Sequence, residues 1–213
     1  ICLLSASVIV DVLFGFFGNK KGWQGFVVRN IAYFLLIVLS LVISLSKSVV
    51  NAYVLFFAVG FILMLVRDSF NGQIENSKGK DVCLNTLDGL AYMSLALGVM
   101  SIAEFSSLAM FGGIFVGASL GLLYWAINKN MPWTTIFLVF KYAMLGFVLG
   151  MGINAVLVSL HTVSAWIALS GTVLAVVGQL LVDIFHNKEK LNQIMNILLL
   201  VGYSVMVASI FFY

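Results

Sequence analysis

The sequence predicts an all-α, polytopic membrane helical bundle of about eight transmembrane helices, forming a single domain over residues 1–213. Hydrophobic residues make up 62% of the chain and charged residues only 9%, which is too little polar surface to cover a water-soluble globule. The chain has one proline, and its apolar runs are long, which favours spanning helices over the short alternating segments of a barrel. We therefore expect a multi-pass integral membrane protein, in the cytoplasmic membrane of a bacterium.

Polar interruptions divide the chain into eight apolar segments, each close to the ~20 residues that cross a hydrocarbon core. In order, the predicted spans are Ile1–Phe17, Phe26–Leu45, Val49–Val66, Cys83–Ile102, Leu108–Ile127, Thr134–Ala155, Ser164–Phe185 and Ile194–Tyr213. The connections are short, and the longest, DSFNGQIENSKGKDV, is polar and cannot hold a second domain. One membrane domain is therefore expected to fill the chain.

Basic residues gather in the loops after the first, third, fifth and seventh predicted spans. These residues are Lys20, Lys21, Arg67, Lys78, Lys80, Lys129, Lys188 and Lys190, whereas the other loops contain only Lys47. The positive-inside rule places such loops in the cytoplasm, so both termini are expected on the non-cytoplasmic side. The net charge of +3 then reflects topology, and no basic stripe with interleaved aromatic residues indicates a nucleic-acid partner.

Six predicted spans each carry an ionisable residue in the half nearest the cytoplasm. These residues are Asp11, Arg29, Asp68, Asp88, Lys141 and Asp183. A charge at membrane depth costs at least roughly 2–3 kcal/mol, so such groups usually face the bundle interior, pair with one another or line a water-filled cavity. We therefore predict a polar cavity open to the cytoplasm. For any one of these residues alone, extension of the side chain into the headgroup layer is an equally good interpretation, and it is the one we expect for Arg67.

Asp68 and Asp183 are the predicted catalytic residues. Both are expected near the C-terminal end of a helix, where the helix dipole disfavours an anion, so each carboxylate needs a cation, hydrogen bonds or a proton. If the two groups face each other in a partly dry pocket, their repulsion would leave one protonated and the other ionised. Such a pair suits general acid and general base catalysis.

The sequence offers little support for other chemistry. Cys2 and Cys83 are too few for a disulfide framework, and no HExxH or CxxC motif occurs. His161 and His186 are predicted on opposite sides of the membrane, so they cannot share a metal. We therefore expect no metal and no cofactor, and we regard a serine-hydrolase interpretation as weak.

Glycines recur at four-residue spacing in the fifth and sixth predicted spans. They are Gly113, Gly117 and Gly121, followed by Gly146 and Gly150. This spacing permits close contact between helices, so packing is the favoured interpretation. The same glycine-rich faces could also support a homo-oligomer.

Four stretches resemble the YhhN-type lysoplasmalogenase family of eight-span membrane proteins. They are AVGFILMLVRDSF in the third span, LDGLAYMSLALGVMSIAEF in the fourth, LSGTVLAVVGQLLVDIFHNK in the seventh, and LLLVGYSVMVAS with its tyrosine Tyr203 in the last. The chain departs from the family's pattern around these residues. The family's Gly-Asp reads Arg67-Asp68, its Ser-Asp reads Val182-Asp183, its fourth-span histidine falls near Leu97 or Gly98, and its last-span glutamine is Val207.

The resemblance implies hydrolysis of the vinyl ether bond of lysoplasmalogens, which releases a fatty aldehyde and a glycerophospho-ethanolamine or -choline. Asp68 and Asp183 would carry out the acid and base steps without a metal, as the carboxylate pairs of glycosidases do. Further candidates for substrate binding are Asp88, Lys141, Tyr203, Arg29 and Asp11. The expected partners are a lysophospholipid substrate and membrane lipids.

Two other functions fit the same charged layer. A small-molecule or proton-coupled transporter would use it as a relay, and a non-enzymatic lipid-binding membrane protein would use it only to hold a headgroup. A closed polar pocket would favour hydrolysis, whereas a continuous polar path toward the outer face would favour transport.

Overall fold

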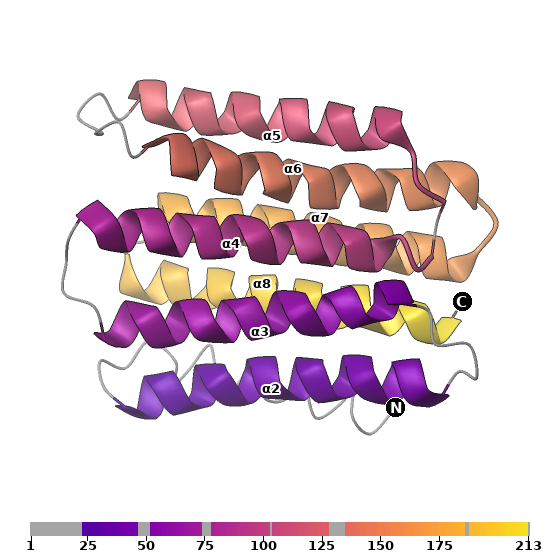
Figure 1. Cartoon of the computed structure of the whole chain (residues 1–213), viewed down its shortest axis with the longest axis horizontal. Helices are drawn as coiled ribbons and strands as arrows, with labels where there is room; N and C mark the ends of the chain where they lie inside the picture. The colour runs from indigo at the N-terminus through magenta and orange to yellow at the C-terminus, as the bar shows by residue number, and fades with distance from the viewer. Residues whose placement is uncertain are drawn as a thin grey trace.

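A computed structural model of the chain describes residues 23–46, 52–73, 78–102, 104–127, 135–185 and 188–212. Within these ranges the protein consists of seven α-helices and one short 3-10 helix, with no strand, and the helices lie alongside one another (Figure 1). The elements are α2 (Trp23–Ser46), α3 (Ala52–Gln73), α4 (Lys78–Val99), α5 (Ser107–Ile127), α6 (Thr135–Val158), α7 (Val163–Ile184), α8 (Glu189–Ala208) and η1 (Ser209–Phe212). The all-α prediction is therefore confirmed for the described residues.

Five of these helices, α3 to α7, are long and apolar enough to cross a membrane. The remaining two, α2 and α8, contain shorter apolar segments, Asn30–Ile43 and Ile194–Ala208. The first predicted span, Ile1–Phe17, lies outside the described residues. A multi-pass helical membrane protein is thus compatible with the structure.

Three helices continue beyond the point where the sequence loses its hydropathy. α3 runs to Gln73 instead of ending at Val66, α4 begins at Lys78, and α8 begins at Glu189. Hydropathy marks where the membrane interior ends, whereas the backbone hydrogen bonds of a helix can continue through polar residues, as they do over RDSFNGQ at the end of α3. Asp68 therefore lies five residues before Gln73, further from the end of its helix than the predicted span Val49–Val66 implies.

Of the seven α-helices in the described residues, six form a ring and one lies outside it. In chain order α2 packs on α3, α3 on α4, α4 on α6, α6 on α7, and α7 on α8, which contacts α2 and closes the ring. Among the described helices, α5 makes extensive contacts only with α6. It lies at one edge of the bundle in Figure 1. The ring brings residues that are far apart in the sequence to one interior.

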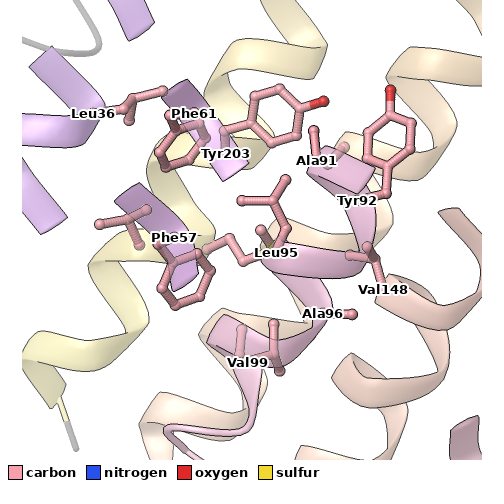
Figure 2. Packing of buried hydrophobic residues seen from close by; sticks show 14 of the residues in the cluster. Leu36, Phe57, Phe61, Ala91, Tyr92, Leu95, Ala96, Val99, Val148 and Tyr203 are labelled. Atoms are coloured by element: carbon pink, nitrogen blue, oxygen red, sulfur yellow. The ribbon is translucent and has the colours of Figure 1, made fainter. Parts of the chain in front are cut away.

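Aromatic and branched side chains fill the middle of this ring (Figure 2). Phe57 and Phe61 of α3 and Leu95 of α4 are fully buried. The rings of Phe61 and Tyr203 meet edge to face, with their centroids 5.7 Å apart. Since lipid tails are as apolar as these side chains, close packing contributes more to helix association in a membrane than the hydrophobic effect does. The packing also fixes the ring of Tyr203, whose hydroxyl reaches the polar site described below.

Glycines bring α5 and α6 into backbone contact. A Cβ atom added at Gly117 would collide with the carbonyl oxygen of Tyr142, and one added at Gly146 would collide with the carbonyl oxygen of Gly113. These glycines therefore pack against each other within one chain, as the spacing predicts. The homo-oligomer stays a prediction.

Replacing Gly117 with leucine is expected to lower the free energy of unfolding by about 1–3 kcal/mol, because the new side chain overpacks the α5–α6 contact. Gly112→Leu is the matched control, since a Cβ atom at Gly112 meets nothing within 4 Å. Both changes raise helix propensity equally, so the control should unfold at or above the wild-type midpoint. Unfolding titrations in detergent micelles measure both variants. Equal effects of the two substitutions would contradict the proposed packing role.

Candidate functional site

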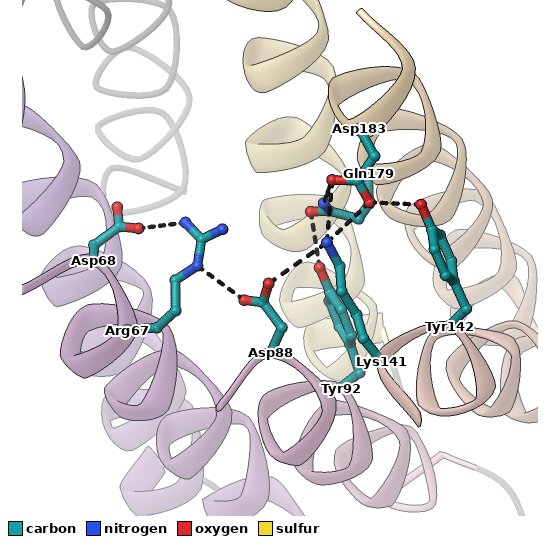
Figure 3. A network of polar contacts seen from close by, with 8 residues as sticks. All are labelled: Arg67, Asp68, Asp88, Tyr92, Lys141, Tyr142, Gln179 and Asp183. Atoms are coloured by element: carbon teal, nitrogen blue, oxygen red, sulfur yellow. Dashed lines mark hydrogen bonds and ion pairs between the residues drawn. The ribbon is translucent and has the colours of Figure 1, made fainter. Parts of the chain in front are cut away.

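Five charged side chains from four helices form a continuous series of ion pairs (Figure 3). The series runs from Asp68 and Arg67 on α3 through Asp88 on α4 and Lys141 on α6 to Asp183 on α7. The Nη1 atom of Arg67 lies 2.7 Å from Oδ1 of Asp68. The Nζ atom of Lys141 lies 3.6 Å from Oδ2 of Asp88 and 2.9 Å from Oδ2 of Asp183. Three carboxyl groups and two cations thus share one end of the bundle.

Arg67 joins the two carboxylates of α3 and α4. Its Nε atom lies 3.2 Å from Oδ1 of Asp88, although the N–H is not aligned well enough to form a hydrogen bond. The side chain is 30% exposed, while the side chains of Asp68 and Asp88 are only 5% and 8% exposed. The prediction that Arg67 extends into the headgroup layer is therefore wrong: two carboxylates hold its guanidinium inside the bundle.

Lys141 and its neighbours satisfy the carboxylate of Asp183. Lys141 donates to both oxygens, at 3.1 and 2.9 Å, and Tyr142 donates to Oδ2 at 2.9 Å. Gln179, one turn earlier on α7, donates to Oδ1 at 2.9 Å. Because a buried carboxylate is costly without such donors, this arrangement explains how Asp183 is accommodated in the last turn of α7, where the helix dipole is unfavourable.

A second polar arm extends from Gln179 toward two tyrosines. Tyr92 donates its hydroxyl hydrogen to Oε1 of Gln179 at 2.8 Å, and Tyr203 lines the same cavity as these two residues. Residue types alone did not single out Tyr92 and Tyr142. A usable signal was the helical spacing, because Tyr92 lies four residues after Asp88 and Gln179 four residues before Asp183, on the same helix faces.

A cavity of about 80 Å³ lies against this network. The charged and phenolic side chains around it are Arg67, Asp68, Asp88, Tyr33, Tyr92 and Tyr203. Its volume corresponds to on the order of five water-sized groups. Asp183 and Lys141 are not among its lining residues, so among the described residues Asp68 and Asp88 are the two carboxylates at the cavity.

The structure brings most of the predicted site residues together. Asp88 and Lys141 belong to the network, and Tyr203 lines the cavity beside it. Asp68 and Asp183 occupy the two ends of the network, each against a cation. The pairing of Asp68 with Asp183 as acid and base stays a prediction. Asp11 lies outside the described residues, and Arg29 belongs to α2 but its side chain is outside the described part of the structure.

In the described residues, neither the serine motif GxSxG nor a cluster of metal ligands forms part of this site. The letters GASLG at 117–121 match GxSxG, but Ser119 is exposed on α5 and donates within the helix to the carbonyl of Phe115. A nucleophilic serine of that motif sits on a turn between a strand and a helix, which this segment does not form. Across the described ranges no group of three or more His, Cys, Asp or Glu residues is placed to hold a metal ion.

Comparisons with protein-family models, with curated proteins and with solved structures find no match to this chain.

Proposed function

We propose that this protein is a membrane-embedded hydrolase of lysoplasmalogens, cleaving their vinyl ether bond by carboxylate acid and base catalysis. The observation that supports this most is the meeting of two carboxylates, Asp68 and Asp88, at one small cavity with a cation between them. A vinyl ether needs only a proton donor, a group that stabilises the resulting cation, and water. The cavity can supply all three.

The environments of the two cavity carboxylates suggest different roles. Asp88 lies against two cations, Arg67 and Lys141, and Asp68 lies against Arg67. Asp68 is therefore proposed as the acid that protonates the alkene carbon remote from the ether oxygen. Asp88 would stabilise the oxocarbenium ion and accept a proton from the attacking water. In the resulting hemiacetal the hydroxyl loses its proton, the bond from its carbon to the original ether oxygen breaks, and that oxygen takes up a proton, which gives the aldehyde and the alcohol of the glycerophospholipid. The proton that Asp88 took from water returns to Asp68 and restores the starting state.

Asp183 is proposed to act through Lys141. It receives hydrogen bonds from Lys141, Tyr142 and Gln179, which hold the ammonium of Lys141 beside Asp88. In this arrangement Asp183 is a positioning residue for the reaction. The resemblance implies a catalytic role for the same residue, and the relative losses on substitution distinguish the two assignments.

The polar contacts favour a reaction site over a transport path. The ion-pair network lies at one end of the bundle, whereas the hydroxyls of Ser40 and Thr172 donate to carbonyls of their own helices. Such internal hydrogen bonds satisfy a hydroxyl without linking helices into a relay.

The proposed protein has eight spans, with both termini on the non-cytoplasmic side of a bacterial cytoplasmic membrane. The network lies at the end of the bundle that contains the basic loops, so the substrate headgroup would be reached from the cytoplasmic leaflet.

Aldehyde release by the purified protein in detergent micelles tests the proposal. We expect release from a lysoplasmalogen, and none from the matching saturated alkyl ether, which cannot form an oxocarbenium ion by protonation of an alkene. An acyl lysophospholipid of the same chain length tests for esterase activity. Release of fatty acid with no release of aldehyde would contradict vinyl ether hydrolysis.

A further inference from the structure

We propose that Arg67 binds the phosphate group of a phospholipid through its Nη2 atom. The identity of the lipid rests on the proposed function, but the binding itself requires no reaction. The family that the chain resembles has glycine at this position, so the resemblance does not imply this contact. The contact between Arg67 and the phosphate would make this arginine the residue that selects phospholipids over lipids without phosphate.

Two of the three guanidinium nitrogens of Arg67 lie against carboxylates, although only one of them donates a hydrogen bond. Nη1 donates to Asp68 at 2.7 Å, and Nε lies 3.2 Å from Asp88. Nη2 has no partner among the described residues, and Figure 3 shows it directed away from Asp68. A guanidinium cannot lose its proton in a protein, so Nη2 keeps two N–H donors for an added acceptor.

The position of Arg67 suits a lipid phosphate. Its side chain lines the cavity and is 30% exposed, so a ligand can reach it. It lies six residues before the end of α3, which is about 9 Å along the helix axis. A phosphate that reaches this depth from the headgroup layer would leave the alkyl chain in the surrounding lipid.

The two carboxylates have opposing effects on such a ligand. They reduce the positive charge that Arg67 presents, which weakens attraction for any anion. They also fix the guanidinium plane, so little side-chain entropy is lost when a phosphate oxygen binds. We therefore expect a selective contact of moderate strength, in which phosphate improves lipid binding roughly tenfold.

Calorimetric titrations in neutral micelles, without phosphate buffer, test this inference. The probes are a saturated alkyl-ether lysophosphatidylcholine, which the proposed reaction cannot cleave, the matching alkylglycerol, and inorganic phosphate as competitor. Wild type should bind the lysophospholipid roughly tenfold more tightly than the alkylglycerol. Arg67→Gln should remove this difference, and Lys188→Gln, which removes an exposed cation at the same end of the bundle, should keep it.

The same titrations identify the source of the phosphate. Displacement of the lysophospholipid by inorganic phosphate would support a site that also takes free phosphate, whereas no displacement would support a lipid headgroup. The double variant Arg67→Gln with Asp88→Asn keeps the wild-type net charge and decides the question if the single variant does not fold. Retention of the tenfold preference in a variant without Arg67, or equal weakening of both lipids, would overturn the proposal. A failure of aldehyde release would leave these binding results unaffected.

Discussion

Asp68→Asn is expected to lower the rate of aldehyde release from a lysoplasmalogen by roughly 10²- to 10⁴-fold, because an amide cannot donate the proton that starts the reaction. The side chain keeps its size and Arg67 keeps its ion pair with Asp88, so the bundle should still fold. Initial rates at saturating substrate measure the loss. Binding of the inert alkyl-ether lysophospholipid reports that the cavity is intact.

Asp81→Asn is the matched control for this substitution, because Asp81 is exposed in the first turn of α4. It should leave the rate within a few fold of wild type. Asp183→Asn should cause a smaller loss than Asp68→Asn, since Asp183 is proposed to act through Lys141. Equal losses for these two substitutions would instead favour the catalytic pair that the sequence predicts, and a fully active Asp68→Asn variant would contradict both assignments.

Lys141→Met is expected to reduce the free energy of unfolding by about 3–5 kcal/mol, because it removes the cation between two poorly exposed carboxylates. The side chain of Lys141 is only 4% exposed, and methionine offers Asp88 and Asp183 no charge or hydrogen bond in its place. Unfolding titrations in detergent micelles measure the change, with Lys188→Met as the control at an exposed position.

Adding Asp183→Asn to Lys141→Met should recover part of the lost stability. The double variant leaves only Asp88 without its lysine, and Asp88 keeps its ion pair with Arg67. The coupling between Lys141 and Asp183 is the sum of the losses in the two single variants minus the loss in the double variant. Additive losses in the single and double variants would contradict the ion pair as a source of stability.

Much of the charged layer could be predicted from the sequence. Asp68, Asp88, Lys141 and Asp183 were expected at one depth because each interrupts an apolar helix near its cytoplasmic end, and the structure brings them into one network. The opening to the cytoplasm and the catalytic role of these residues stay predictions. Depth can be estimated from sequence because the membrane imposes the same hydropathy limits on every helix.

The partners within the layer could not be predicted in the same way. Asp68 and Asp183 were expected to need a cation, hydrogen bonds or a proton, but their helices are far apart in the chain. Which cation each carboxylate meets depends on how α3, α4, α6 and α7 are arranged around the ring. Arg67 is an example. Its apolar stem and its position near a helix end are typical of a residue that reaches the headgroups, but the arrangement of α3 and α4 places its guanidinium against Asp68 and Asp88.

The sequence alone determined the all-α class and the apolar helices, and it predicted one shared layer of charged groups, since these depend on whether each segment prefers lipid or water. It also predicted the glycine positions at which α5 and α6 meet. Only the tertiary structure decided that Asp68 and Asp88 share the cavity while Asp183 lies behind Lys141. The physical reason is that hydropathy is a property of one helix, whereas an ion pair requires the rotation and packing of two.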